Sequence, residues 1–102
     1  MAVLDAARRK CGQSLIIEYR ISLDEKLPGG MKPEETQEFI KMIKDRIDIV
    51  HVSAGSLANP ETVQHMIQPF YTPHMYNVHL AELVKKHVDI PVTAVGSIMN
   101  LE

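Results

Sequence analysis

The fold of this chain is decided by one stretch, Ile47-Asp48-Ile49-Val50-His51-Val52-Ser53-Ala54-Gly55. Its β-branched residues favour an extended backbone, and the small residues at its end let a ligand or another backbone come close where strand pairing stops. This central strand is predicted near residues 47–54, and two similar stretches flank it, near residues 15–22 and 90–97. Because segments with helical periodicity separate the three stretches, the order predicts an α/β fold with a parallel sheet.

The two faces of the predicted strands differ in polarity. Glu18, Arg20 and Ser22 share one face of the first strand. His51 and Ser53 share one face of the second strand. A strand inside an open doubly wound sheet is normally apolar on both faces, whereas polar residues that gather on one face indicate a barrel whose mouth they line. We therefore predict a partial (β/α)8 barrel with about three βα units.

Helical periodicity precedes the first strand and follows it. Residues 2–11 place their small and apolar side chains on one helical face, and Gly12 is well placed to end that helix in a left-handed conformation. Cys11 lies on the apolar face, so we expect it to be a packing thiol rather than a nucleophile. Pro33 suits the first position of a second helix, which is predicted over residues 33–45.

A long excursion separates the second strand from the last helix. Residues 56–76 exceed what a simple connection needs, and long loops at the carboxyl ends of barrel strands are where substrate contacts tend to lie. Within it, Asn59 is expected to begin a short helix. Asn77 is expected to cap the helix that leads to the third strand.

Composition limits the classes of function. The chain has 102 residues, enough for one small domain, and its net charge of −2 gives no electrostatic reason to expect nucleic acid as a partner. No run approaches the roughly 20 apolar residues that span a bilayer, so we expect no membrane segment and a cytoplasmic location. The single cysteine and the scattered histidines provide no convincing metal-ligand spacing.

The number of repeats is smaller than a closed barrel requires. Three strands are predicted, whereas a (β/α)8 barrel has eight in roughly 250 residues. We therefore expect residues 1–100 to be a fragment of a barrel domain, and residues 101–102 to be a cloning remnant. The outer strands would then be open edges, so we expect self-association through them.

Four motifs occur in an order that is typical of one enzyme family. They are Tyr19-Arg20-Ile21-Ser22, Pro28-Gly29-Gly30, His51-Val52-Ser53-Ala54-Gly55 and Ile90-Pro91-Val92-Thr93-Ala94-Val95-Gly96. On these motifs the chain resembles the NADH:flavin oxidoreductases of the old yellow enzyme group, from residue 3 to about residue 100. Within that group it looks most like the branch that contains 2,4-dienoyl-CoA reductase, the 2-enoate reductases and the bile-acid-converting enoate reductases.

The resemblance implies a barrel that binds FMN and uses NAD(P)H to reduce the activated C=C bond of an enoate or enone. By similarity, Arg20 would contact the flavin ring, where a fixed cation stabilises negative charge. Gly96 would approach the FMN phosphate with its main chain. Ser97 stands where relatives often carry an arginine, so it could donate a hydrogen bond to the phosphate but could not neutralise its charge. The isolated fragment would lack most of the site and be inactive.

Candidate proton donors for an enoate substrate lie in the long loop. His74 falls where some members of the group place a substrate-binding or protonating residue, and Tyr71 or Tyr76 could donate a proton, with packing of the loop as the alternative for both tyrosines. His51 is expected to be a hydrogen-bonded core histidine, and His65 is expected to have no role at a site. The 4Fe-4S cluster of the dienoyl-CoA reductase branch would lie outside this chain.

Two other hypotheses remain open. Another phosphate-binding barrel, such as an aldolase or synthase, would require a catalytic lysine or a carboxylate pair at strand ends, and Glu18 is the only acidic residue within a strand on the polar face. A non-catalytic interaction module with a flavodoxin-like core would be a stable monomer with covered edges. For Arg20 itself, a salt bridge with Glu18 or another neighbour is the alternative to a flavin contact.

Overall fold

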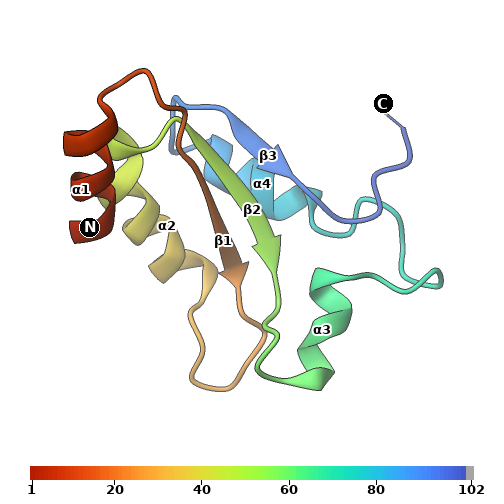
Figure 1. The fold of residues 1–102 in the computed structure, drawn as a ribbon. Helices are drawn as coiled ribbons and strands as arrows, with labels where there is room; N and C mark the ends of the chain where they lie inside the picture. Colours follow the sequence, from red (N-terminus) through yellow and green to blue (C-terminus); the bar gives the residue numbers. More distant parts are fainter. Residues whose placement is uncertain (101–102) are drawn as a thin grey trace.

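Three parallel strands form one open sheet, and helices alternate with them along the chain (Figure 1). The computed structural model describes residues 1–100, so the expected cloning remnant at residues 101–102 lies outside the described residues. In chain order the elements are α1 (Ala2–Cys11), β1 (Glu18–Asp24), α2 (Pro33–Ile43), the 3-10 helix η1 (Lys44–Arg46), β2 (Ile49–Ala54), α3 (Pro60–Met66), α4 (Val78–Lys85) and β3 (Val92–Ala94). The sheet order β1-β2-β3 confirms the predicted α/β fold and is consistent with part of a (β/α)8 barrel.

The register of the sheet places polar residues of neighbouring strands side by side. Where β1 pairs with β2, Arg20 lies opposite His51 and Ser22 lies opposite Ser53. Where β2 pairs with β3, His51 lies opposite Thr93. Because residues paired in this way point to the same side of a sheet, the three strands share one polar face.

The outer strands differ from their predicted ranges. β1 begins later than predicted, and the carbonyl of Leu15 before it accepts a hydrogen bond from Arg8 of α1 at 2.7 Å rather than from a strand. β3 ends earlier than predicted because Gly96 and Ser97 have φ angles of 125° and 49°. Such angles are incompatible with an extended strand.

The two faces of the sheet differ as the alternation predicted. α2 packs on β1, and α4 packs on β2 and β3, so the side chains that face these helices are buried. Val50, Val52 and Ala54 are all 0% exposed. On the opposite face, Glu18 and Arg20 are exposed to solvent. A doubly wound sheet carries helices on both faces, so this arrangement favours the barrel interpretation over a flavodoxin-like core.

α1 makes little apolar contact with the rest of the protein. Leu4 is its one buried residue, whereas Val3 is 80% exposed. Cys11 is exposed, so the prediction of a packing thiol is wrong. The reason is position, because α1 lies at the margin beside α2 (Figure 1) and Cys11 is its last residue. Gly12 ends the helix with a positive φ of 67°, although its ψ of −161° lies outside the left-handed helical region that was expected.

The Asp48 carboxylate joins α1, β1 and β2. Its Oδ2 atom accepts a hydrogen bond from the main-chain N–H of Ile17 at 2.7 Å and forms an ion pair with the guanidinium of Arg8 at 2.6 Å. A second ion pair, between Arg46 Nε and Asp5 Oδ1 at 2.6 Å, ties α1 to η1. The hydrogen bonds from Ile17 and Arg8 hold the pKa of Asp48 below its usual value, and the hydrogen bond from Arg46 does the same for the pKa of Asp5.

We expect acid to destabilise the fold through Asp48. A carboxylate whose pKa is lowered on folding stabilises the folded state above its ordinary pKa, here 3.8, and this stabilisation is lost as the pH falls through the lowered value. Urea unfolding at pH values of about 6 and about 3 should therefore show a smaller drop in the free energy of unfolding for Asp48→Asn, which keeps an acceptor for Ile17 but has no charge to lose. Asp45→Asn removes an exposed aspartate and should keep the full drop. Equal drops for the unaltered chain and Asp48→Asn would contradict the prediction.

Self-association through the sheet edges stays a prediction. Within residues 1–100, β1 and β3 each pair with a strand on one side only, which leaves main-chain donors and acceptors open on the other. We expect the molar mass measured by light scattering after size-exclusion chromatography to rise with protein concentration. A well-folded monomer at every concentration would count against it and would favour the interaction-module hypothesis.

Candidate functional site

The candidate site is the uncovered face of the sheet, near the carboxyl ends of the strands. Arg20, His51 and Thr93 form one row across β1, β2 and β3. Ser22 and Ser53 form the next polar row toward the strand ends. Because parallel strands bring all their carboxyl ends to one edge of the sheet, this is the edge at which barrel enzymes place their reactive groups.

Arg20 is a cation on this face that is unpaired within the described part of the chain. Its side chain is exposed, and within residues 1–100 its guanidinium has no hydrogen-bond or ion-pair partner. The salt bridge with Glu18 that the sequence allowed is not formed. Glu18 Oε1 instead lies 3.2 Å from His51 Nδ1. The arrangement leaves Arg20 able to bind an anionic group that approaches the open face.

Near the strand ends, a serine side chain of β1 is hydrogen-bonded to the main chain that follows β2. Ser22 Oγ donates a hydrogen bond to the carbonyl of Gly55 at 2.7 Å, and the N–H of Gly55 donates to the carbonyl of Asp24 at 2.8 Å. Gly55 has a φ of 80°, and a Cβ at this position would collide with the carbonyl oxygen of Thr62 in α3. The close approach that the sequence predicted at Gly55 is therefore made by the backbone of α3.

Gly96 and Ser97 form a turn that is packed against the segment leading into α4. A Cβ on Gly96 would lie 3.0 Å from Gln68 Oε1 and 3.1 Å from Asn77 Nδ2, so the position has little room for a side chain. The N–H of Met75 donates a hydrogen bond to the carbonyl of Ser97 at 3.2 Å. Within residues 1–100, the main-chain N–H groups of Gly96 and Ser97 themselves donate to no acceptor. Two adjacent main-chain N–H groups without an acceptor remain able to donate hydrogen bonds to an anion.

Asn77 joins this turn to α3 and does not cap α4 as predicted. It precedes the helix, but its side chain makes no capping hydrogen bond. Nδ2 donates instead to the carbonyl of His65 at 2.9 Å. The Oδ1 atom is buried and has no hydrogen-bond partner among the described residues. The residue is 1% exposed, so this amide belongs to the interior of the protein beside Gly96.

The candidate proton donors lie in two environments. Tyr71 and Tyr76 line a cleft of about 240 Å³, whereas His74 is exposed and does not line it. The ring of His65 stacks on Tyr76, with the ring centroids 5.7 Å apart. The cleft is lined by Gln64, His65, Tyr71, Thr72, Pro73 and Tyr76. From the sequence, His65 was expected to have no role at a site. The helical spacing of α3 does not show that the later loop folds back onto it.

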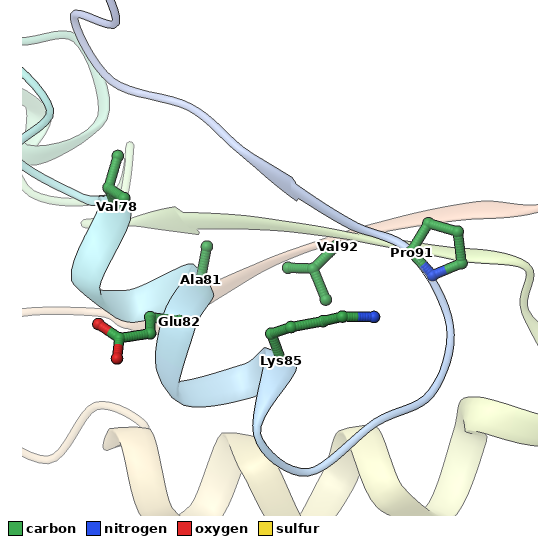
Figure 2. Close-up of a pocket in the computed structure, with 6 residues that line it drawn as sticks. All are labelled: Val78, Ala81, Glu82, Lys85, Pro91 and Val92. Carbon is green, nitrogen blue, oxygen red and sulfur yellow. The ribbon is translucent and has the colours of Figure 1, made fainter. Parts of the chain in front are cut away.

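A larger groove of about 490 Å³ lies on the helix side of the sheet, between α4 and β3. It is lined by Val78, Ala81, Glu82, Lys85, Pro91 and Val92. Figure 2 shows the side chain of Lys85 extending past Val92 toward Pro91. Lys85 Nζ donates a hydrogen bond to the carbonyl of Ile90 at 3.2 Å. The sheet itself separates this groove from the polar face, so the groove is not part of the candidate site.

Within residues 1–100, no three His, Cys, Asp or Glu side chains are grouped so that they could hold a metal ion. No helix in the same range is both long enough and apolar enough to cross a membrane. The cytoplasmic location stays a prediction.

No protein-family model matches the chain, but the relatives found among known proteins include two oxidoreductases. The chain is 32% identical over 103 residues to an NADH oxidase of Thermoanaerobacter brockii, a match that covers 100% of this chain and 15% of that protein. It is 33% identical over 100 residues to an NADPH dehydrogenase of Clostridium acetobutylicum, which covers 97% of this chain and 27% of that protein. The chain is therefore a distant homologue, over its whole length, of part of each of these oxidoreductases.

We expect Gly55→Ala to destabilise the protein more than Gly29→Ala. Both glycines have positive φ, 80° and 74°, so alanine strains the backbone at either position by about 1 kcal/mol. A Cβ at Gly29 meets nothing within 4 Å, whereas a Cβ at Gly55 meets α3. Urea unfolding should show a loss of about 1 kcal/mol for Gly29→Ala and about 2–4 kcal/mol for Gly55→Ala. Equal losses would mean that α3 does not pack on Gly55.

Proposed function

We propose that this chain is part of an FMN-dependent oxidoreductase of the old yellow enzyme group, which uses NAD(P)H to reduce the activated C=C bond of an enoate or enone. The homology to an NADH oxidase and an NADPH dehydrogenase supports the reaction class. The observation that carries the proposal is the unpartnered Arg20 on the open face of a parallel sheet. The chain spans 15% and 27% of these relatives. We therefore expect it to hold part of the site and to be inactive alone.

The residues at the strand ends fit a flavin nucleotide. Bound FMN would accept a hydride from the nicotinamide and deliver it to the C=C bond. Arg20 would hold the electron-rich edge of the ring by charge-assisted hydrogen bonds, because its guanidinium is exposed and has no competing partner within residues 1–100. The fixed positive charge favours the ring when it carries additional electrons.

The turn at Gly96 and Ser97 would hold the phosphate of FMN. Its two main-chain N–H groups, which have no acceptor within residues 1–100, would donate hydrogen bonds to the phosphate. Ser97 adds a hydroxyl donor without a positive charge. We therefore propose a phosphate contact that depends on main-chain dipoles, while Arg20 supplies the charge at the ring.

The candidate proton donors can be ranked by whether they line the cleft beside α3. Tyr71 and Tyr76 share the cleft, so within this proposal they are favoured over His74 as donors to the substrate. The iron–sulfur cluster of the dienoyl-CoA reductase branch would be held by segments other than this one, because this chain has a single cysteine. Enoate identity and the choice between NADH and NADPH would also be set outside this chain.

The aldolase or synthase hypothesis gains no support at the strand ends. It requires a free catalytic lysine or a carboxylate pair. Lys26 Nζ lies 2.8 Å from Asp24 Oδ2, and Asp24 Oδ1 accepts from the Lys26 N–H at 2.9 Å, so this pair closes the turn after β1. Burial of Asp24 raises its pKa, but the hydrogen bonds from Lys26 outweigh this effect and leave the pKa below its usual value. A carboxylate held in this way is a turn residue rather than an acid or base.

FMN should bind this chain weakly, with a dissociation constant of about 0.1–1 mM, because one part of the site supplies few of the contacts. In an amide NMR titration, we expect FMN to shift the signals of Arg20, Gly96 and Ser97. Riboflavin, which lacks the phosphate, should shift Arg20 and leave the other two in place. NAD(P)H oxidation by the chain with FMN should not exceed that by FMN alone.

Arg20→Leu tests the role of the guanidinium. It should weaken FMN binding about tenfold, as expected for the loss of a hydrogen bond to a charged group. Arg9→Leu removes an exposed arginine of α1 and should bind FMN as the unaltered chain does. Unshifted signals at all three residues, or equal affinities for the two variants, would overturn the proposed flavin site.

A further inference from the structure

Glu18 and Arg20 occupy the same face of β1, two positions apart. Neighbours at this spacing on a strand are separated by about 6.6 Å, which two long side chains can bridge. Both residues are exposed, so neither is held apart from the other by burial. Opposite charges in this arrangement normally form an ion pair, and an ion pair here would occupy the guanidinium of Arg20.

In the structure Glu18 contacts His51 and not Arg20. His51 extends from β2, directly opposite Arg20 and diagonal to Glu18. Its Nδ1 atom lies 3.2 Å from Glu18 Oε1, so the imidazole ring is in direct contact with the carboxylate. The side chain of His51 is 21% exposed, against 46% for Glu18, so the histidine is the more fixed partner. Its Nε2 atom is buried and has no partner among residues 1–100, which leaves Glu18 as the group that orients the ring.

We propose that His51 is a positioning residue that holds the Glu18 carboxylate away from Arg20 and so keeps Arg20 available to an anion. The identity of that anion as a flavin rests on the proposed function, whereas the availability of Arg20 does not. His51 acts on the site through Glu18 and touches no ligand in this proposal. Without the imidazole, the nearest cation on the same face of β1 is Arg20, and the carboxylate turns to it.

The reactivity of Arg20 toward phenylglyoxal, a dicarbonyl that modifies free guanidinium groups, measures this availability directly. The rate at each arginine of the full 102-residue chain is followed by peptide mass spectrometry. In the unaltered chain Arg20 should react as fast as the exposed Arg9. It should react faster than Arg8 and Arg46, whose guanidinium groups are 2.6 Å from Asp48 and Asp5.

Four variants separate the positioning role from a structural one. His51→Leu should slow the modification of Arg20 about two- to fivefold, the range that a partly exposed ion pair supports. The double variant Glu18→Gln with His51→Leu should restore the rate, because no carboxylate remains to pair with Arg20. His51→Gln supplies a donor for Glu18 and should react as the unaltered chain does. Thr93→Val changes the same row of the sheet without touching this contact and should also leave the rate unchanged.

An unchanged rate in His51→Leu would overturn the proposal, as would a double variant that stays slow. Continued protection of Arg8 and Arg46 shows in the same experiment that each variant keeps the fold, since their partners belong to other elements. The assay contains no flavin. The expected pattern of rates together with unshifted signals in the FMN titration would therefore retain this inference and reject the proposed function.

Discussion

The hydrogen bond from the main-chain N–H of Ile17 to the Asp48 carboxylate is the interaction on which the arrangement of the sheet depends. Ile17 immediately precedes β1 and Asp48 immediately precedes β2, so the bond sets the two strands against each other at their starting points. Arg8 holds the same carboxylate and brings α1 to this corner. A slip of one residue in the register would turn every alternate side chain to the other face, and Arg20 would then point at the helices.

One face of the sheet forms the apolar core, and the other carries the polar residues of the candidate site. The helix-facing residues of β2 are fully buried and contribute the core, whereas the opposite face carries ionic and hydroxyl groups that would be costly to bury unpaired. Packing of α3 on Gly55 closes the end of β2 and brings His65 toward the loop that carries the tyrosines. The position of His65 beside Tyr76 thus depends on a backbone contact at a small residue, Gly55.

A structural feature could be predicted from the sequence where its cause lies in residues that are close together in the chain. Alternation in β2 and the proline at the start of α2 are local signals, and both elements were confirmed with small differences in their bounds. Cys11 and Asn77 were misjudged because helical spacing and helix-end preferences do not report what lies beside a helix. The sequence could not identify the contact partner of Glu18 for the same reason. Its choice between Arg20 on its own strand and His51 on the next depends on the register of two distant segments.

The parallel order of the strands also determines how the protein must fold. Ser22 and Ser53 are neighbours in the sheet but lie 31 positions apart in the chain, so each strand pairing closes a long loop before it gains a hydrogen bond. α2 and α4 lie within these loops and form from local contacts, which arise far faster than strand pairings of this separation. The Asp48 corner is completed only when β1 and β2 meet. Until then the apolar residues of the strands remain exposed, and folding competes with aggregation in proportion to protein concentration.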